Sequence, residues 1–587
     1  MLPNRYKINT TEYDDVHPEE TLADGLSAHS SVEVPVSRAV FGTLYTIIGL
    51  CLVLILFQAM RLQIVHGGQY AAQADRSRFN RYPVAGLRGA IVDTHGVPLV
   101  ENIPAFDVVL ARSEFNTVNL DRLSSILGGP VTIGNQGVIT LRKDAPKSVA
   151  ISVQAAQIPG VYIVPTAKRH YIEGSAAAHI IGYTSEGLQG ERIGREGVEA
   201  YYDSYLRVPP EYVALIPNMS ITTSDADNIS TARLTIDSAV QQALYDAVTS
   251  VFREHGVHRG AAIVQRVTTG EILGMVSIPS FNSNNIDAKI LTDSNRPLFN
   301  RAVSGLYAPG STIKPLYALA GLKEHIVTPS TLVYANGSIE VPSEVDPSKT
   351  YIFRDWKVHG WTDIRKAIAW SVDVYYYALG GGYGDISGLG VDRIEKYLRL
   401  FGVDKKTDVD LPAEAAGFVP SKQWKKDTRG EPWYLGDTYN ISIGQGDLQV
   451  TPIWLSAYVS SIANGGRMMK PFIVSSISKN GKNIYANEPE VMLDLPFDAA
   501  TVRVVQEGMR QTVIDGTATM LQDLPQAVAA KTGTAQVTGK NLNSLLVVYG
   551  PYDKPDISVT VLIEQIKDSQ LLGVQVAHRF LMWYFQQ

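Results

Sequence analysis

The chain has 587 residues, of which 45% are hydrophobic and 19% charged, and its formal net charge is −6 at pH 7. This hydrophobic share is enough for packed cores, and the mildly acidic balance excludes the basic footprint of a nucleic-acid-binding protein. The single cysteine, Cys51, excludes a disulfide framework within the chain and a zinc site built on several cysteines.

An uncharged stretch of 22 residues, 39–60, follows a polar tail over residues 1–38. At about 1.5 Å rise per residue, it is long enough to cross about 30 Å of hydrocarbon as a helix. No small-x-small cleavage site follows, so the sequence predicts an uncleaved anchor with one crossing. The flanking arginines are more numerous on the C-terminal side, which by the positive-inside rule favours a cytoplasmic domain, but long domains follow this rule weakly.

Two regions follow the anchor. Residues 62–231 mix short strand-like runs with turns and contain no catalytic constellation. From about residue 234 the pattern predicts a helix at 235–248, a hairpin at 260–278, a helix-rich middle, strands at 527–537, 543–550 and 556–564, and a terminal helix near 568–585. Because strands lie at both ends of this region and short turns favour antiparallel pairing, we expect one five-stranded antiparallel sheet flanked by helices, an α+β architecture.

The first candidate motif is Ser311-Thr312-Ile313-Lys314. Pro315 is tolerated only in the first turn of a helix, so a helix should begin near Ser311 and place Lys314 on the same face. A serine hydroxyl needs a nearby base to act as a nucleophile, and a lysine can be that base if its pKa is lowered. A second S-x-x-K string, Ser476 to Lys479, is predicted to be a strand, which would point the two side chains to opposite faces.

Two further motifs occur downstream, Ser371-Val372-Asp373 between two helical runs and Lys531-Thr532-Gly533-Thr534 on a predicted strand. A glycine inside a strand often marks close approach by another backbone. The lysine and the threonines of the last motif could then hold a substrate carboxylate. Alone, neither short string is specific.

Taken in order, the three motifs resemble those of the penicilloyl serine transferases, S-x-x-K, S-x-N and K-T-G. The sequence segments around these motifs also match the family, and they cover most of 234–587. They are YAPGSTIKP at the nucleophile, ISIGQGDLQVTPIW at 441–454, IANGG at 462–466 and KTGTAQ at 531–536. The chain is identified as a member of the class B penicillin-binding proteins. Region 62–231 resembles the family's non-catalytic pedestal through Arg88-Gly89 to Gly96 and Arg169-His170-Tyr171 to Tyr183. Asp373, where most of the superfamily has Asn, and Phe353-Arg354-Asp355-Trp356 resemble the elongation-type subgroup.

The resemblance implies a D,D-transpeptidase acting on a peptidoglycan stem pentapeptide and acylated by β-lactams. Ser311 would attack the penultimate D-Ala carbonyl, and a neighbouring stem's amine would take the acyl group. Lys314 would be the general base, Ser371 a proton relay and Asp373 the group that orients Lys314.

The same resemblance assigns substrate binding to the third motif. Lys531 would contribute a positive electrostatic potential at the substrate carboxylate. Thr532 and Thr534, with Gly533 between them, would bind that terminal carboxylate. The backbone N–H groups of Ser311 and Thr534 would form the oxyanion hole.

The implied organisation is a cytoplasmic tail at 1–38, a transmembrane helix at 39–61, a pedestal at 62–231 and a transpeptidase domain at 232–587. The substrate lies outside the cytoplasmic membrane, so we expect the catalytic domain there, against the arginine count. No glycosyltransferase motif precedes residue 234, so we expect a polytopic membrane glycosyltransferase as partner. We expect no cofactor. Some relatives hold zinc near Asp355 and His359, but no cysteine is available here, and we expect these two to be surface or packing residues.

Three other functions use the same motifs. A D,D-carboxypeptidase would release the acyl group to water, although a pedestal argues against it. A β-lactam sensor would need a signalling domain, for which residues 1–38 are too short. A scaffold with a silent site stays open on motifs alone, although every expected nucleophile, base and carboxylate anchor is present.

Overall fold

The computed structural model describes residues 38–62, 81–134, 136–188, 190–215, 229–343, 346, 348–537, 541–567 and 571–587. The chain divides into two compact units, Met1–Asn80 and Arg81–Gln587. The predicted tail at 1–38 lies outside the described residues apart from Arg38. The first unit contains one described helix, α1 (Arg38–Met60), whose Phe41–Met60 stretch is long and apolar enough to cross a membrane. The helix predicted at 39–60 is thus confirmed.

The second unit contains the predicted five-stranded sheet, in the order β11 (Ile272–Ile278), β10 (Gly260–Arg266), β22 (Ile557–Ile566), β21 (Leu542–Gly550) and β20 (Ala529–Gln536). Every neighbouring pair is antiparallel. The sheet is therefore closed by strands from both ends of the region, as the sequence predicts. The mixed α+β class is also confirmed.

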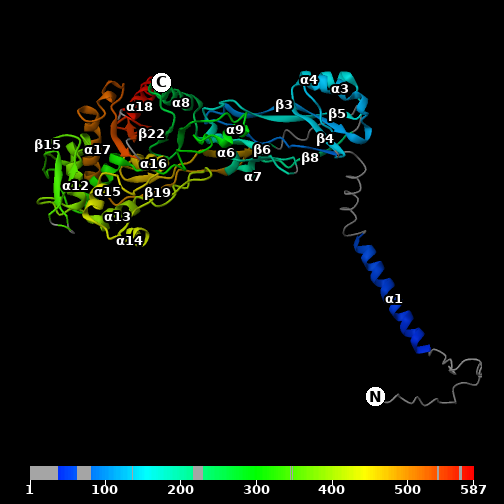
Figure 1. Ribbon diagram of the computed structural model, residues 1–587, viewed down its shortest axis with the longest axis horizontal. Coiled ribbons are helices and arrows are strands. Elements are labelled where there is room, and N and C mark those ends of the chain that lie inside the picture. Colours follow the sequence, from blue (N-terminus) through cyan, green and yellow to red (C-terminus); the bar gives the residue numbers. More distant parts are fainter. Residues whose placement is uncertain are drawn as a thin grey trace, which may run out of the picture. The chain divides into compact units, whose positions relative to one another are not determined.

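Helices cover both faces of this sheet (Figure 1). The side chains of its strands alternate between two cores, one on each face. On β21, Leu546 and Val548 join the core beneath α8 (Ser238–His255) and α18 (Leu572–Tyr584). Leu545 and Val547 join the larger helical core on the other face. Strands buried on both faces read as continuous apolar runs, which is the pattern of this sequence.

The helical core on the second face surrounds α10 (Lys314–Lys323), which is buried along almost its whole length. A short 3₁₀ helix, η6 (Gly310–Ile313), leads directly into it. The other helices of this layer are α11 (Ile364–Ala369), α12 (Asp373–Gly381), α13 (Gly390–Leu400), α14 (Lys422–Arg429), α15 (Leu435–Ser442), α16 (Pro452–Ala463) and α17 (Ala499–Ile514). Small two-stranded sheets border the layer: β12 (Val333–Ala335) with β15 (Gly360–Thr362), β13 (Ser338–Pro342) with β14 (Thr350–Arg354), and β16 (Arg467–Met469) with β19 (Val491–Asp494).

A second, seven-stranded sheet joins the N-terminal part of this unit to its C-terminal part. Its order is β18 (Lys482–Ala486), β17 (Val474–Lys479), β9 (Ser230–Leu234), β2 (Ala90–Val92), β3 (Pro98–Ala111) and β4 (Val138–Ala145), and β5 (Val161–Tyr171) also pairs with β3. The string from Ser476 to Lys479 therefore lies on a strand, as predicted.

The N-terminal part also contains α3 (Leu120–Leu127), α4 (Lys147–Ala156), the short helices α5 (Ala178–Ile181), α6 (Gly197–Tyr201) and α7 (Asp203–Leu206), and the hairpin of β6 (Thr184–Glu186) and β7 (Arg192–Gly194). The two sequence segments that resemble the pedestal, one with Arg88 and the other with Arg169, both contact the buried carboxylate of Glu199. Glu199 accepts from Arg88 Nε and, at 2.8 Å, from Arg169 Nε, and all three side chains are buried. Buried charges need such partners, and removing one leaves an uncompensated charge.

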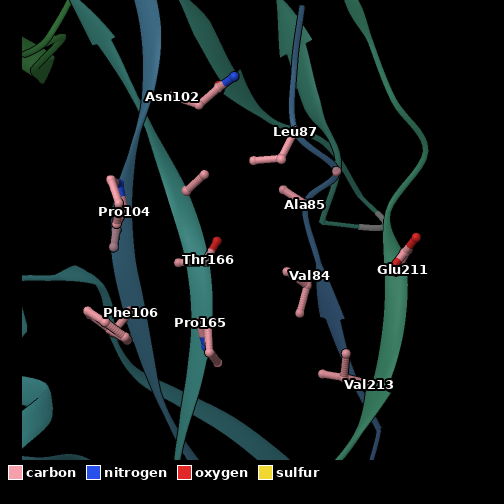
Figure 2. A pocket seen from close by; sticks show the side chains of 13 residues that line it. Val84, Ala85, Leu87, Asn102, Pro104, Phe106, Pro165, Thr166, Glu211 and Val213 are labelled. Carbon is pink, nitrogen blue, oxygen red and sulfur yellow. The ribbon is translucent and has the colours of Figure 1, made fainter. Parts of the chain in front are cut away.

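A cavity of about 340 Å³ lies in the N-terminal part between two pairs of strands (Figure 2). The pair β1 (Arg81–Val84) and β8 (Glu211–Ala214) contributes Val84 and Val213, and the pair of β3 and β5 contributes Phe106 and Pro165. Glu211 is the only ionisable side chain among the described residues that line it. This cavity therefore lacks the paired nucleophile and base of an active site.

Candidate active site

The three sequence motifs meet in one cleft of about 1060 Å³. Its lining includes Ser311 from η6, Ser371 and Asp373 at the start of α12, and Thr532, Gly533 and Thr534 from the edge strand β20. Residues about 60 and 160 positions apart in the chain are thus brought together by the fold.

The nucleophile motif begins as a 3₁₀ helix and continues as α10 from Lys314, with Pro315 in its first turn. The predicted helix start near Ser311 is confirmed, but its first turn is tighter than expected. In a 3₁₀ turn, side chains at i and i+3 eclipse one another, so Ser311 and Lys314 share one side. The turn is packed against β20: a Cβ on Gly310, whose φ is +52°, would lie 2.5 Å from the Thr534 carbonyl oxygen.

Lys314 connects the first motif to the second. Its side chain is completely buried, and Nζ donates to the Ser371 carbonyl oxygen at 2.8 Å and to Ser371 Oγ at 3.3 Å. It also lies 2.5 Å from Asp373 Oδ1. Within the described part of the chain, its hydrogen bonds are to the second motif and not to the Ser311 hydroxyl.

The second motif combines backbone strain with a buried carboxylate. Ser371 has a φ of +56°, a left-handed conformation that is uncommon for a residue with a Cβ and is found more often at functional sites. Burial raises the pKa of Asp373 above its usual range, an effect opposed by the charge of Lys314 and reinforced by that of Asp355.

The third motif presents a polar strand edge to the cleft. Lys531 is completely buried and donates from Nζ to the Thr532 carbonyl oxygen at 2.9 Å. Burial and then the nearby charge of Lys314 hold its pKa well below the usual lysine value. A Cβ on Gly533 would lie 2.7 Å from Thr312 Cγ2, which explains why this strand position lacks a side chain.

Two residues expected to be surface or packing residues both have buried side chains. Asp355 and His359 form a completely buried pair, with His359 Nε2 3.5 Å from Asp355 Oδ1. Asp355 Oδ2 accepts a hydrogen bond from the Val374 N–H at 3.0 Å, in the first turn of α12. Of the two expected alternatives, the structure therefore shows packing and not the surface: this helix start needs an acceptor because its N-cap, Val372, has no polar side chain.

The same pair is too small a donor set for zinc. A structural zinc site takes four ligands. Among the residues that the structure describes, no three His, Cys, Asp or Glu side chains gather in a way that could hold a metal ion. Asp355 and His359 are therefore best explained as a pair that supports the second motif.

Comparison with known proteins agrees with this geometry. A model of the penicillin binding protein transpeptidase domain matches residues 260–581, and one of the penicillin-binding protein dimerisation domain matches residues 83–213. The chain belongs to the penicillin-binding protein transpeptidase family. Within it, the chain is a class B, elongation-type member, as its motifs predict.

The curated relatives include peptidoglycan D,D-transpeptidase MrdA of Acinetobacter baumannii, 30% identical over 89% of this chain and 84% of that protein. MrdA of Escherichia coli K12 is 27% identical over 86% of this chain and 87% of that protein. Among solved structures, penicillin-binding protein 2 of Helicobacter pylori in complex with MreC has a TM-score of 0.71 at 26% identity, covering 86% of this chain and 99% of that chain. A peptidoglycan synthase complex that coordinates polymerization and crosslinking has a TM-score of 0.66 at 26% identity, covering 93% of this chain and 99% of that chain.

Proposed function

We propose that the protein is a peptidoglycan D,D-transpeptidase that crosslinks stem peptides through a serine acyl-enzyme, and that β-lactams acylate the same serine. The observation that carries this function is the meeting of Ser311, the Lys314–Ser371–Asp373 group and the K-T-G strand in one cleft. Family membership and the printed activity of the MrdA relatives support it.

Acylation begins at Ser311. Its Oγ forms a bond to the carbonyl carbon of the penultimate D-Ala, and the amide bond to the terminal D-Ala breaks. Lys314 takes the hydroxyl proton. Because Lys314 Nζ already lies 3.3 Å from Ser371 Oγ, a proton can pass along this contact to the leaving amine.

The opposite side of the cleft holds the substrate's end. Thr532 and Thr534 bind the terminal carboxylate. The buried Lys531 of the same strand contributes a positive electrostatic potential there. The backbone N–H groups of Ser311 and Thr534 stabilise the oxyanion, and Gly310 allows the close approach of these two segments. Each such donor is typically worth about 3–4 kcal/mol at the transition state.

Asp373 has a role that an asparagine fills in most of the superfamily. Its carboxylate lies against Lys314 Nζ and holds that amine towards Ser371. An ionised carboxylate only accepts hydrogen bonds, whereas a protonated one also donates. Burial raises the pKa of Asp373, and the charge of Lys314 opposes this shift.

The acyl-enzyme is then resolved by the amine of a neighbouring stem. A D,D-carboxypeptidase would use water instead. Mass spectrometry of products from purified protein, a polymerising partner and lipid-linked precursor separates the two, with Ser311→Ala as the control. Crosslinked dimers are expected from the wild type alone, and trimmed stems without dimers would refute transpeptidation.

The domain order proposed is a cytoplasmic tail at 1–38, an anchor at 39–61, a pedestal at 62–231 and a transpeptidase domain at 232–587. We place 62–587 outside the cytoplasmic membrane, where the substrate is. Protease added to intact spheroplasts should degrade this region; survival until the membrane is lysed would contradict the orientation. A polytopic membrane glycosyltransferase is the proposed partner, in line with the relative solved in a peptidoglycan synthase complex.

A further inference from the structure

One wall of the cleft is formed by residues of β14 and the segment that follows it. Ile352, Arg354 and Trp356 all line the cleft and are exposed. Successive side chains of an extended strand point to opposite sides, so Ile352, Arg354 and Trp356 share one side, and the half-buried Phe353 also contributes to the lining. Phe353 packs edge-on against Tyr439 with ring centroids 4.9 Å apart, and Asp355 bonds to the start of α12.

This wall lies on the side of the cleft that carries Asp373. The Tyr377 hydroxyl on α12 donates to the Arg354 carbonyl oxygen at 3.2 Å, and Asp355 accepts from the Val374 N–H. β14 is thereby fastened to the helix that begins at Asp373. The carboxylate-binding strand β20 contributes a different set of lining residues.

Arg354 provides an exposed positive charge in this cleft. Among the described residues that line the cleft, only Arg354 and Asp373 are of the types Arg, Lys, His, Asp or Glu, and Asp373 is already paired with Lys314. Lys314 and Lys531 are completely buried. Within the described part of the chain, the Arg354 guanidinium has neither an ion pair nor a hydrogen bond. A planar guanidinium always carries its charge and matches a carboxylate with two parallel hydrogen bonds.

We propose that Arg354 forms a carboxylate subsite for the acyl half of the donor stem, flanked by the apolar side chains of Ile352 and Trp356. This inference rests on the proposed function. The terminal carboxylate is assigned to β20, so the carboxylate at Arg354 is a second one, on a side chain of the acyl portion. The subsite selects donors that carry this negative charge and adds no step to the acyl transfer.

Two penicillins test the subsite because they differ by one group. Carbenicillin carries a carboxylate on the acyl side chain that benzylpenicillin lacks. Acylation rate constants are measured for both drugs with the full-length wild type and Arg354→Gln. The ratio of the carbenicillin rate to the benzylpenicillin rate should fall about 3- to 10-fold in Arg354→Gln, the size of a partly exposed charge-assisted hydrogen bond. The Arg354→Lys variant should recover part of it.

The control removes an equal charge outside the cleft. Arg503 on α17 is 77% exposed, and Arg503→Gln should leave the ratio unchanged. The effect of Arg354→Gln should also shrink at high salt, because screening weakens exposed charges. An unchanged ratio in Arg354→Gln, or an equal fall in Arg503→Gln, would overturn the subsite. Failure of benzylpenicillin to acylate the wild type would instead contradict the proposed function itself.

Discussion

Asp355 offers the sharpest structural prediction, because it holds the catalytic loop without lining the cleft. Its Oδ2 accepts from the Val374 N–H at 3.0 Å, and its Oδ1 accepts from the Trp356 N–H at 2.8 Å. Helix α12 begins at Asp373, and its N-cap, Val372, provides no side-chain acceptor. Replacing Asp355 with alanine therefore removes the acceptor that fixes the residue next to Asp373.

The expected loss follows from these contacts. Losing a helix cap costs about 0.5–2 kcal/mol, and leaving a buried donor unsatisfied costs about 1–3 kcal/mol. Asp355→Ala should therefore destabilise the protein by about 2–4 kcal/mol. It should also slow acylation by tenfold or more, since Asp373 would no longer be held against Lys314. Asp355→Asn keeps one acceptor oxygen and should lose less of both.

Thermal unfolding and the rate of labelling by a fluorescent penicillin measure the two effects separately. Burial raises the pKa of Asp355, but the contacts with His359 and the Val374 N–H and the charge of Lys314 outweigh it, so the pKa lies below its usual range. Its stabilising contribution is present above about pH 4, the unfolded value, and is lost as pH falls through the lower folded value. Wild-type stability and labelling in Asp355→Ala would refute this role.

Three further predictions concern the cleft itself. Asp373→Asn should keep substantial acylation, whereas Asp373→Leu should lose about 1–3 kcal/mol or more by leaving Lys314 without its carboxylate partner; equal acylation rates for the leucine variant and the wild type would remove Asp373 from the site. Lys314→Ala should slow penicillin labelling by about 10²- to 10⁴-fold without unfolding the domain, and a normal rate would show that another group is the base. Lys531→Met should weaken acylation yet raise the free energy of unfolding by about 1–3 kcal/mol, because a buried ammonium with a lowered pKa is unfavourable when charged. Since the unfolded chain binds that proton more tightly, the gain should be larger at pH 6 than at pH 10, and calorimetry showing no gain at pH 6 would contradict it.

The five-stranded sheet could be predicted because its signal is local. Long apolar runs at both ends of the region, separated by short turns, indicate buried antiparallel strands, and the alternation on β21 places them between two cores. The helix start at the S-x-x-K motif could also be predicted, because Pro315 restricts where a helix can begin.

The rest depends on contacts between distant segments. The seven-stranded sheet pairs 90–92 with 230–234 and 230–234 with 474–479, and no periodicity in any one segment indicates its partners. The sequence left open whether Asp355 is a surface or a packing residue for a similar reason. Charged residues are mostly exposed, and only the uncapped start of α12, 18 positions along the chain, explains its burial. The left-handed backbone conformation of Ser371 likewise could not be predicted, because serine is not a residue type that favours it.

Ser311 is the proposed acylated nucleophile, and the chain contains its own control. Ser476 has the same S-x-x-K spacing, but it lies on β17, where Lys479 points to the opposite face. Mass spectrometry of peptides from penicillin-treated protein should find the drug's added mass on the peptide containing Ser311 alone. Ser311→Ala should abolish the adduct and Ser476→Ala should leave it intact. An adduct that persists in Ser311→Ala, or one that disappears in Ser476→Ala, would contradict this account.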